Sequence, residues 1–271
     1  MKILLTGSSG FIGTHITKQF SKKHTIIPYD KRNGQDILDQ KKLEQHMKGV
    51  DLVIHLAALL NQAESWDKSE AYFTTNVFGT YTVLTAAKNM QVKRVIYLSS
   101  AAVYANTLTP YGLSKKLGEE LCRMFRDSMD ITILRPFNLY GPGQNDAYNY
   151  VIHTFVKQLK KNEPIVIFGD GKQSRDFLFI DDFISLLEKI IVLPPVAGPI
   201  DIGTGKEITI RSLAQLLGEI LDKKVTITSL PKRVEPYRSQ ANIKQLQKLG
   251  ITPSFISLED GLRKLLLPLS S

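Results

Sequence analysis

The sequence predicts an α/β protein with a Rossmann-type, doubly wound parallel sheet and a smaller C-terminal α/β part. Short apolar runs alternate with amphipathic helical patterns from the first residue, which is typical of βαβ units. The runs are apolar nearly throughout, as in Val95-Ile96-Tyr97-Leu98, as expected of strands covered by helices on both faces. A glycine-rich turn joins the first run to the first helical pattern.

The elements follow in a regular order in the N-terminal half and in a looser one afterwards. We expect strands near residues 2–6, 25–29, 51–55, 93–98 and 130–134. Amphipathic helical segments lie between them at about 11–22, 39–47, 66–89 and 112–127. After residue 143 we expect helices near 147–161, 181–192, 210–221 and 257–267, and strands near 165–168, 176–179, 200–202 and 225–228.

Length and composition limit the class of protein. At about 150 residues per domain, 271 residues allow one large α/β unit or a large and a small domain. The single cysteine, Cys122, cannot form an intramolecular disulfide, so we expect a reducing cytoplasm. No cluster of His, Cys or carboxylate residues has the spacing of a metal site, so we expect no metal. No apolar stretch is long enough for a signal peptide or a membrane span.

The net charge of +9 raises the question of an anionic partner. The basic residues are scattered as pairs such as Lys22-Lys23 and Lys160-Lys161, without a basic arm or a nucleic-acid-binding motif. A solvated surface explains them best, attraction of small anionic substrates is the second explanation, and we expect no nucleic acid.

The first strand leads into Thr6-Gly7-Ser8-Ser9-Gly10-Phe11-Ile12-Gly13. Glycines at a strand-to-helix turn permit a tight turn, close approach of a pyrophosphate and close helix–strand packing, while the helix N-terminus offers N–H groups to the anion. One extra residue separates the first two glycines compared with the commonest fingerprint, so a plain turn is the alternative. The motif predicts a dinucleotide site.

Asp30 ends the second strand, about 20 residues after the glycines, where an acid accepts hydrogen bonds from the adenosine ribose. A carboxylate there repels a 2′-phosphate, which favours NAD over NADP. Lys31 and Arg32 follow at once and can offset part of that charge, so NADP and a merely solvated turn acid stay as alternatives.

Tyr111 and Lys115 lie four residues apart on a predicted helix and therefore share one face. A lysine ammonium beside a phenol lowers the tyrosine pKa toward the neutral range that a general base needs. A surface pair is the alternative, but the fourth strand ends at Ser99-Ser100, which places hydroxyl groups at the ligand-binding edge of a parallel sheet. We expect Ser100 to position a substrate hydroxyl or ketone, Tyr111 to move its proton and Lys115 to hold a ribose; Ser99 can be structural.

The order of motifs resembles the extended short-chain dehydrogenases/reductases, in particular the NAD-dependent epimerases, dehydratases and reductases of nucleotide sugars. The resemblance spans essentially the whole chain and rests on residues 6–13, Asp36-Ile37, His55-Leu56-Ala57-Ala58, Asn76, Tyr111-x-x-x-Lys115, residues 135–142, residues 169–176 and residues 202–205. It implies NAD as cofactor and a nucleotide sugar, most simply a UDP-sugar, as substrate.

The resemblance also implies roles for single residues. The cofactor would be held by Gly7, Ser9, Gly10, Phe11, Ile12, Gly13, Asp30, Lys31, Asp36, Ile37, Leu56, Ala57, Ala58, Asn76, Tyr111, Lys115 and Pro136. Asp36 would bind the adenine amino group, and Ile37 would pack on the adenine ring. The alternative for Asp36 is an ordinary acid in a loop. The alternative for Ala57-Ala58 is close packing at the end of a strand. His55 is expected to be a packed or hydrogen-bonded core histidine.

Residues after the positioning serine decide the reaction class. Dehydrating relatives carry an Asp-Glu pair there, and decarboxylating relatives carry a glutamate at the second position, whereas this chain has Ala101-Ala102. Methyl groups transfer no protons, so both reactions are disfavoured unless Glu119, Glu120 or a carboxylate from the C-terminal part supplies the acid. The segment 105–110 is shorter than in relatives, which puts substrate choice in doubt more than chemistry.

The substrate side would use Ser100, Asn138, Arg175 and Arg233. Arg175 resembles the arginine that grips the nucleotide diphosphate, since a guanidinium fork suits phosphate, with an ion pair to Asp176 or Asp181 as the alternative. Asn138 is alternatively a turn former, and Arg238 competes with Arg233 for the second phosphate contact.

The sequence therefore predicts an NAD-binding domain of residues 1–141 plus about 171–202 and a substrate-binding domain of about 142–170 plus 203–271. The hypothesis is an NAD-dependent nucleotide-sugar epimerase that acts at C4 of a UDP-hexose or UDP-N-acetylhexosamine through a 4-keto intermediate. The alternatives are a reductase of an NDP-4-keto sugar and a non-catalytic dinucleotide-sensing protein. Relatives often dimerise, which suggests a homodimer through the helices near 66–89 and 112–127.

Overall fold

The computed structural model describes residues 1–144, 150–232, 236–252 and 254–267, and their contacts form two units. Unit 1 consists of Met1–Pro136 and Ile184–Asp201, and unit 2 of Phe137–Phe183 and Ile202–Ser271. These boundaries differ from the predicted ones at about 141 and 171. The reason is strand pairing, because residues 171–183 contain two short strands that pair with partners in unit 2.

A six-stranded sheet organises unit 1, in the order β10-β5-β4-β3-β1-β2. Its strands are β1 (Lys2–Thr6), β2 (Thr25–Tyr29), β3 (Leu52–His55), β4 (Arg94–Leu98), β5 (Asp130–Pro136) and β10 (Pro199–Ile202). Neighbours from β2 to β5 are parallel, and Thr6 is in register with both Tyr29 and His55. The doubly wound fold is thereby confirmed. Strand order reverses beside β1, and a ligand crevice is expected at the carboxyl ends of β1 and β3.

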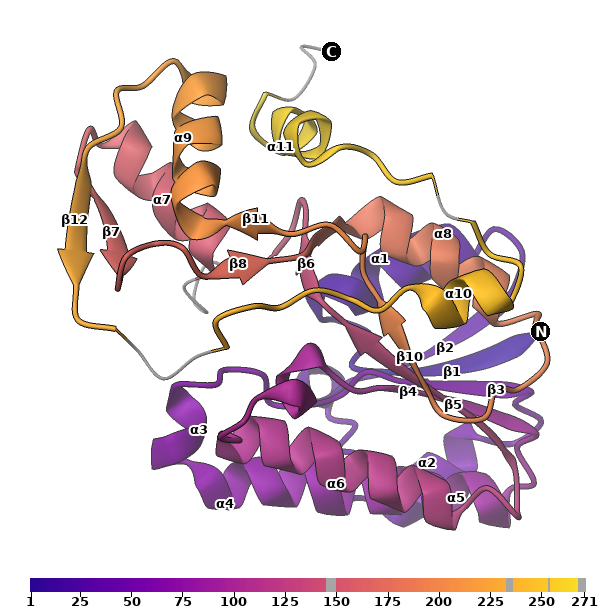
Figure 1. Ribbon diagram of the computed structural model, residues 1–271. Coiled ribbons are helices and arrows are strands. Elements are labelled where there is room, and N and C mark those ends of the chain that lie inside the picture. Colours follow the sequence, from indigo (N-terminus) through magenta and orange to yellow (C-terminus); the bar gives the residue numbers. More distant parts are fainter. Residues whose placement is uncertain (145–149, 233–235, 253, 268–271) are drawn as a thin grey trace. The chain divides into compact units, whose positions relative to one another are not determined.

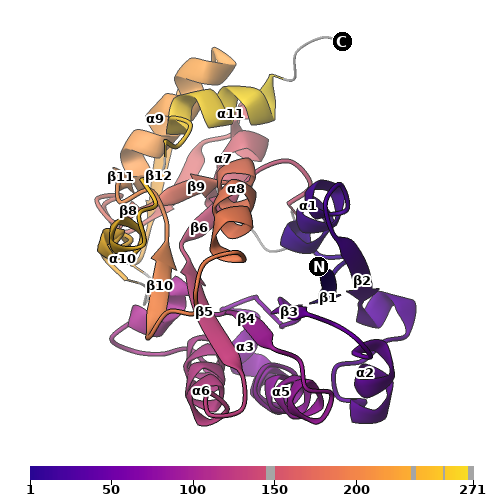
Figure 2. The same cartoon turned by 90° about the vertical axis from the view of Figure 1, so that its right-hand side faces the viewer.

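Helices cover both faces of this sheet (Figure 2). On one face lies α1 (Phe11–Phe20), and on the other lie α2 (Gln40–His46), α5 (Gly79–Asn89) and α6 (Pro110–Met124). Buried apolar side chains from β1, β3 and β4, such as Leu4, Val53 and Val95, pack in one cluster with Leu43 of α2 and Leu84 of α5. Burial on both faces explains why these strands are apolar throughout.

The predicted long helix at 66–89 is interrupted. It is divided into α3 (Glu64–Asp67), α4 (Ser69–Tyr72), a π-helical turn at Phe73–Phe78 and α5. Lys68 leaves helical geometry with φ −120° and ψ 33°, which separates α3 from α4. The wide π turn contains Asn76, which is buried. An apolar period of 3.6 residues does not reveal such an insertion, since it persists across the turn.

Unit 2 has a separate core. Its apolar residues come from three helices and from β7 (Ile165–Phe168). The helices are α7 (Val151–Lys160), α9 (Ile210–Leu221) and α11 (Leu258–Leu266). They correspond to the helices expected near 147–161, 210–221 and 257–267. β12 (Ile227–Leu230) pairs in parallel with β7. The expected helix near 181–192 is α8 (Ile180–Ile190), which crosses from unit 2 into unit 1.

The sequence did not predict the shortest elements. These are β6 (Asn138–Tyr140), β8 (Ser174–Arg175), β11 (Ile208–Thr209), α10 (Lys244–Lys248) and two 3₁₀ turns at Lys31–Asn33 and Ala101–Tyr104. β6 pairs in parallel with β9 (Phe177–Phe179), and β8 pairs antiparallel with β11. Strands of two or three residues are too short to show an alternation, so only pairing defines them. Figure 1 labels the elements.

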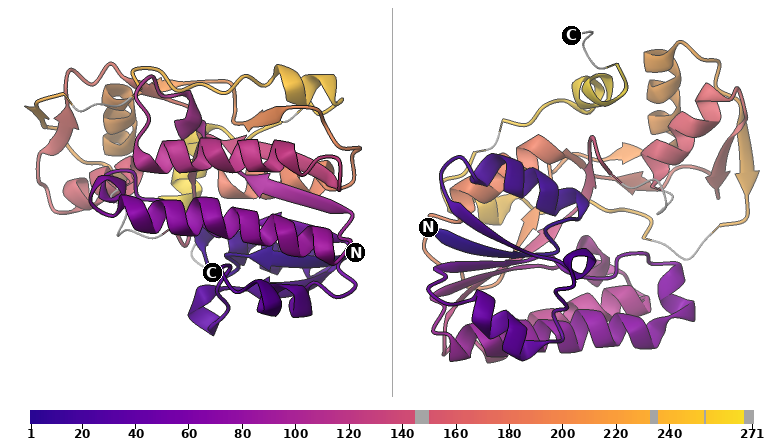
Figure 3. Two further views of the ribbon diagram at one scale, coloured as in Figure 1. Left: turned by 90° about the horizontal axis from the view of Figure 1, so that it is seen from below. Right: turned by 180° about the vertical axis from the view of Figure 1, so that it is seen from behind.

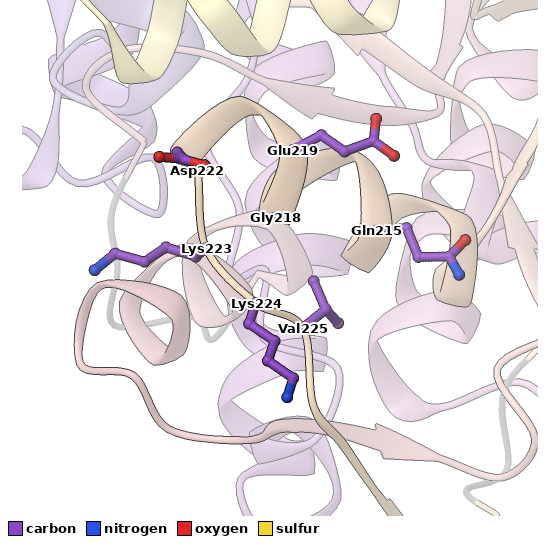
Figure 4. A pocket seen from close by; sticks show the side chains of 7 residues that line it. All are labelled: Gln215, Gly218, Glu219, Asp222, Lys223, Lys224 and Val225. Carbon is purple, nitrogen blue, oxygen red and sulfur yellow. The ribbon is translucent and has the colours of Figure 1, made fainter.

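Two further observations concern the surface. In the part of the chain that the structure describes, no helix has the length and apolar character needed to cross a membrane. A depression at the end of α9 is lined by Gln215, Gly218, Glu219, Asp222, Lys223, Lys224 and Val225 (Figure 4). None of these is a predicted site residue.

Candidate functional site

The turn between β1 and α1 has the backbone of an anion site. Gly7 has φ +70°, and a Cβ there would lie 2.8 Å from the backbone nitrogen of Ala57. A Cβ on Gly13 would collide with the carbonyl oxygen of Gly7 and the backbone of Ser8. Both positions therefore require glycine. Gly7 needs it for its positive φ and for the close approach of the Ala57 backbone, and Gly13 needs it only because the backbone of Gly7 and Ser8 is so close.

Gly10 starts α1 in an extended conformation, and no side chain caps this helix. The first N–H groups of a helix have no acceptor within the helix, and the helix dipole adds positive charge at that end. A side-chain cap would occupy these donors. Its absence and the space kept by the glycines fit the pyrophosphate of a dinucleotide.

Asp30 lies at the end of β2, next to this turn, and is nearly buried. Its carboxylate accepts a hydrogen bond from the backbone N–H of Ser9 at 2.9 Å and another from that of Arg32 at 2.9 Å. The acid is therefore fixed beside the glycine turn, with lone pairs left for a ribose. The Arg32 guanidinium donates to the carbonyl oxygen of Ser9 at 3.1 Å.

Lys31 does not pair with Asp30. Its ammonium lies 2.9 Å from Asp36, and this contact, with the N–H of Leu38, lowers the pKa of the Asp36 carboxyl despite the opposing effect of burial. The neighbouring Ile37 is buried, and a Cβ on Gly79 would collide with its side chain. Ile37 thus packs on α5. The charge of Asp30 is left largely unopposed by Lys31, which favours NAD.

The segment after β3 is bonded to the end of β1. The backbone N–H groups of Leu56 and Ala57 each donate to the Thr6 hydroxyl at 3.2 Å. Asn76 holds the next turn, because its amide oxygen accepts from Leu59 N–H at 2.8 Å and its amide nitrogen donates to the Leu59 carbonyl at 3.0 Å. The Asn76 amide also donates to Ser114 at 2.9 Å, so its side chain holds the segment after β3 to α6.

His55 is a buried core histidine, as expected. Its Nδ1 lies 2.7 Å from the Thr6 hydroxyl and its Nε2 3.0 Å from that of Thr80. The Thr80 hydroxyl donates to the carbonyl of Asn76, so Nε2 carries the proton and Thr6 donates to Nδ1. Burial first, and the charge of Lys115 second, lower the pKa of His55 to about 3. The imidazole is neutral.

The predicted catalytic side chains gather at the end of β4 and the start of α6. Tyr111 and Lys115 are buried one turn apart on α6, and Ser100 follows β4. The Ser100 hydroxyl accepts from Ala102 N–H at 3.1 Å, and it lies close enough to the Tyr111 hydroxyl to lower the pKa of that phenol. Thr109 caps α6 through Gly112 N–H at 3.1 Å, so the short segment 105–110 still delivers Tyr111 in place.

The expected lowering of the Tyr111 pKa is wrong for the free protein. Burial raises the pKa of this phenol, and the hydrogen bond from Ser100 only partly opposes the rise. Burial instead lowers the pKa of Lys115 to about 8, against the attraction of Cys122 and Glu119. The Lys115 ammonium lies 4.7 Å from the ring centre of Tyr97, a cation–π contact. Desolvation of both groups is the physical reason, and the sequence alone does not give its size.

The two residues that follow Ser100 are alanines and carry no carboxylate. Ala101 and Ala102 form the 3₁₀ turn that Ser100 caps. Glu119 is buried and paired with Arg135, and Glu120 is exposed and paired with Arg123. Glu119 and Glu120, two of the carboxylates that the sequence left open, are therefore held in ion pairs with arginines.

Unit 2 carries the predicted substrate residues. The Asn138 amide donates to the Asp176 carbonyl at 3.0 Å. The Arg175 guanidinium donates to the carbonyl oxygens of Ser174 and Pro236, each at 2.8 Å. Arg233 lies outside the described residues. Its competitor Arg238 forms an ion pair with Glu207 at 2.6 Å.

Two buried acids were missed as organising residues. Asp176 is fully buried and accepts from Thr204 N–H and hydroxyl, Gly205 N–H and Ala241 N–H, so it ties three segments of unit 2 together. Glu119 does the same in unit 1. A charge in the apolar face of α6 was the available signal for Glu119, because a charge is rarely buried without a partner.

Comparisons with known proteins agree with this geometry. The sequence model of the NAD dependent epimerase/dehydratase family matches residues 3–201. A Bacillus subtilis (strain 168) protein named as an uncharacterized UDP-glucose epimerase is 30% identical over 313 aligned positions, covering 100% of this chain and 98% of that protein. A putative UDP-glucose 4-epimerase of Methanocaldococcus jannaschii is 31% identical and covers 97% of this chain and 96% of its own length.

A solved structure is similar over the same length. The UDP-glucuronic acid 4-epimerase of Bacillus cereus, in complex with UDP-glucuronic acid and NAD, has a TM-score of 0.88 and 30% identity, covering 98% of each chain. Proteins named as a 4,6-dehydratase and as decarboxylases also occur among the relatives.

Proposed function

This chain belongs to the NAD dependent epimerase/dehydratase family, and we propose that it is an NAD-dependent nucleotide-sugar epimerase. The reaction inverts C4 of a UDP-hexose or UDP-N-acetylhexosamine through a transient 4-keto intermediate. The observation that carries this conclusion is the pair of buried side chains, Tyr111 and Lys115, together with the half-buried Ser100, which two alanines follow. It supplies proton transfer at a sugar hydroxyl and no acid for elimination.

Different residues of unit 1 bind the cofactor and transfer the proton. The turn from Gly7 to Gly13 holds the pyrophosphate of NAD, and Asp30 holds the adenosine ribose. When bound, NAD would supply the reversible hydride transfer at C4 of the sugar. Ser100 positions the C4 hydroxyl, Tyr111 takes its proton and later gives it back, and Lys115 favours the phenolate.

The raised pKa of Tyr111 fits this division. In the free protein the phenol is held protonated by burial, and only Ser100 opposes this. A positive charge near the phenol lowers its pKa, and the nicotinamide ring of the oxidised cofactor would bring such a charge. The base is thus active only in the loaded enzyme.

Dehydration and decarboxylation are less well supported, although relatives with those names occur. Both need a further acid or base near the sugar. Ala101 and Ala102 provide none, and Glu119 is neutralised by Arg135. A reductase of a 4-keto sugar would use the same residues once, in one direction, and differs by consuming reduced cofactor.

Residues of unit 2 bind the nucleotide in this proposal. Asn138 and Arg175 contact the sugar and the diphosphate, as in the related pattern, with Arg233 as a second phosphate contact. The Arg175 guanidinium is oriented by the carbonyl oxygens of Ser174 and Pro236, and a planar guanidinium is the group that suits phosphate oxygens. Support for a UDP-sugar comes from the relatives' own substrates.

We also propose a homodimer through α5 and α6. These helices lie side by side in unit 1 (Figure 3, left), and the Tyr81 and Phe125 rings touch at a centroid distance of 6.0 Å. Large apolar side chains on or next to them are exposed, among them Phe78, which directly precedes α5, at 62% and Met124 of α6 at 72%. A second copy covers such a face most simply, since an isologous contact needs only one patch.

A substrate panel tests the proposed function. Purified protein is incubated with UDP-glucose, UDP-N-acetylglucosamine and UDP-glucuronate, each with and without reduced cofactor, and products are followed by proton NMR. A C4 epimer formed without added reductant supports the proposal. Conversion only of a 4-keto sugar, with matching loss of reduced cofactor, assigns the reductase instead.

A further inference from the structure

Glu119 and Arg135 form an ion pair next to the segments that carry the catalytic residues. Glu119, on α6, accepts from the Arg135 guanidinium through both carboxylate oxygens, at 2.8 and 2.6 Å. The same carboxylate accepts from the Ser99 hydroxyl at 2.6 Å. Glu119 is 1% exposed, so three hydrogen bonds replace its hydration.

These bonds connect the elements that carry the site. Glu119 follows Lys115 by one helical turn, Ser99 directly precedes Ser100, and Arg135 lies near the end of β5. The carboxylate therefore joins α6 to the ends of β4 and β5. Without these hydrogen bonds, the positions of Ser100 and Tyr111 relative to each other would no longer be fixed.

The hydrogen-bond network of Glu119 continues through Arg135 to Tyr104 and Asp201. The Arg135 guanidinium donates to the Tyr104 hydroxyl at 2.6 Å and lies 4.7 Å from its ring centre. The Tyr104 hydroxyl in turn donates to Asp201 at 2.8 Å. The 3₁₀ turn after Ser100, which contains Tyr104, is thereby tied to β10 as well.

We propose that Glu119 is a positioning residue for the epimerase reaction, because its carboxylate fixes the Ser100 strand end against the helix that carries Tyr111 and Lys115. This inference rests on the proposed function for the identity of the reaction. The geometry itself concerns only residues of unit 1.

The same carboxylate acts on the charge of Lys115. Burial lowers the pKa of this ammonium to about 8, and Glu119 raises it against burial. The groups that face Lys115 are His55 on β3, Tyr97 on β4, and Tyr111, Glu119 and Cys122 on α6. His55 is neutral and the phenols are protonated in the free protein, so Glu119 is the charged group among them.

The test compares Glu119→Gln with Glu120→Gln. Both residues lie on α6, but the Glu120 side chain is 53% exposed and pairs only at the surface. In the free full-length protein, the Lys115 titration is followed by NMR of ¹³Cε-labelled lysine, with the signal identified by its loss in Lys115→Arg. Glu119→Gln should move that titration to lower pH, and Glu120→Gln should leave it in place.

Kinetics give the second readout. Above both pKa values, each unit of downward shift removes about 10-fold of the ammonium form. We therefore expect kcat to fall and its alkaline limb to move to lower pH in Glu119→Gln, with KM for the UDP-sugar nearly unchanged. If Glu119→Gln does not fold, Glu119→Gln combined with Arg135→Gln removes the unpaired charge and serves in its place.

The outcomes separate the two claims. An unchanged Lys115 titration and an unchanged kcat, with only the unfolding midpoint lowered, would overturn the positioning role. Absence of epimerisation by the unaltered protein would overturn the proposed function, while the Lys115 titration would still decide the role of Glu119.

Discussion

Tyr111 bears the proton transfer in this account. Tyr111→Phe should lower turnover about 10²-fold or more, because a general base contributes that much or more to such a reaction. NAD should still bind, as measured by calorimetry, since the phenol is not part of the pyrophosphate turn. Tyr72→Phe is the matched control, because this buried ring packs edge-on against Tyr111 at 6.4 Å. Full turnover by Tyr111→Phe would end the proposed mechanism.

His55 makes stability depend on pH. Its pKa is about 3 in the folded protein against 6.5 unfolded, so below pH 6.5 the unfolded chain binds a proton that the folded chain does not. The contribution is therefore complete above pH 6.5 and is lost as pH falls toward 3, at about 1.4 kcal/mol per pH unit. Denaturant unfolding between pH 4 and 7 should show a slope shallower by that amount in His55→Gln. Parallel slopes would contradict a neutral His55.

Residue types and spacing predicted the reacting groups but not their electrostatics. Ser100, Tyr111 and Lys115 were identified from their positions along the chain, and the structure brings them together. The direction of the Tyr111 pKa shift was wrong, since it depends on how much of the phenol other elements bury. Asp176 and Arg135 were missed as structural anchors because their partners lie far away in sequence.

At the scale of the element, the β1–α1 turn depends on the absence of two side chains. Gly13→Ala should weaken NAD binding and lower stability, because its Cβ meets the backbone of Ser8 and Gly7, which cannot move without opening the turn. Gly10→Ala, in the same turn, should lose less binding and stability, as its Cβ approaches only the Gly7 carbonyl oxygen at 3.2 Å. Calorimetric binding of NAD and thermal unfolding measure both. Equal losses in the two variants would show that contact at Gly13 is not decisive.

Periodicity predicted the large elements because their burial repeats along the chain. The five predicted N-terminal strands are all present, and α9 matches its predicted bounds at 210–221. The break at Lys68 and the π turn around Asn76 were missed because they arise from local contacts within an apolar pattern that continues. Short strands such as β8 depend on partners that the sequence does not reveal.

At the scale of the whole molecule, the exposed face of α5 and α6 should decide the assembly state. Phe78→Glu combined with Met124→Glu should convert a dimer to a monomer, because two charges would be buried in the interface. Val192→Glu is the control, as Val192 is 71% exposed in unit 1 but lies outside these helices. Sedimentation velocity measures the state. A monomeric unaltered protein, or a dimer that survives the double substitution, would contradict this interface.

The central claim is that one hydride leaves C4 and returns to the same carbon. The most direct measurement follows a UDP-hexose labelled with deuterium at C4 through the reaction by NMR. We predict a C4 epimer that retains the label, with no net formation of reduced cofactor. Loss of the label, or a new methyl signal from a 4-keto-6-deoxy sugar, would contradict the claim, because Ala101 and Ala102 cannot transfer the protons that dehydration needs.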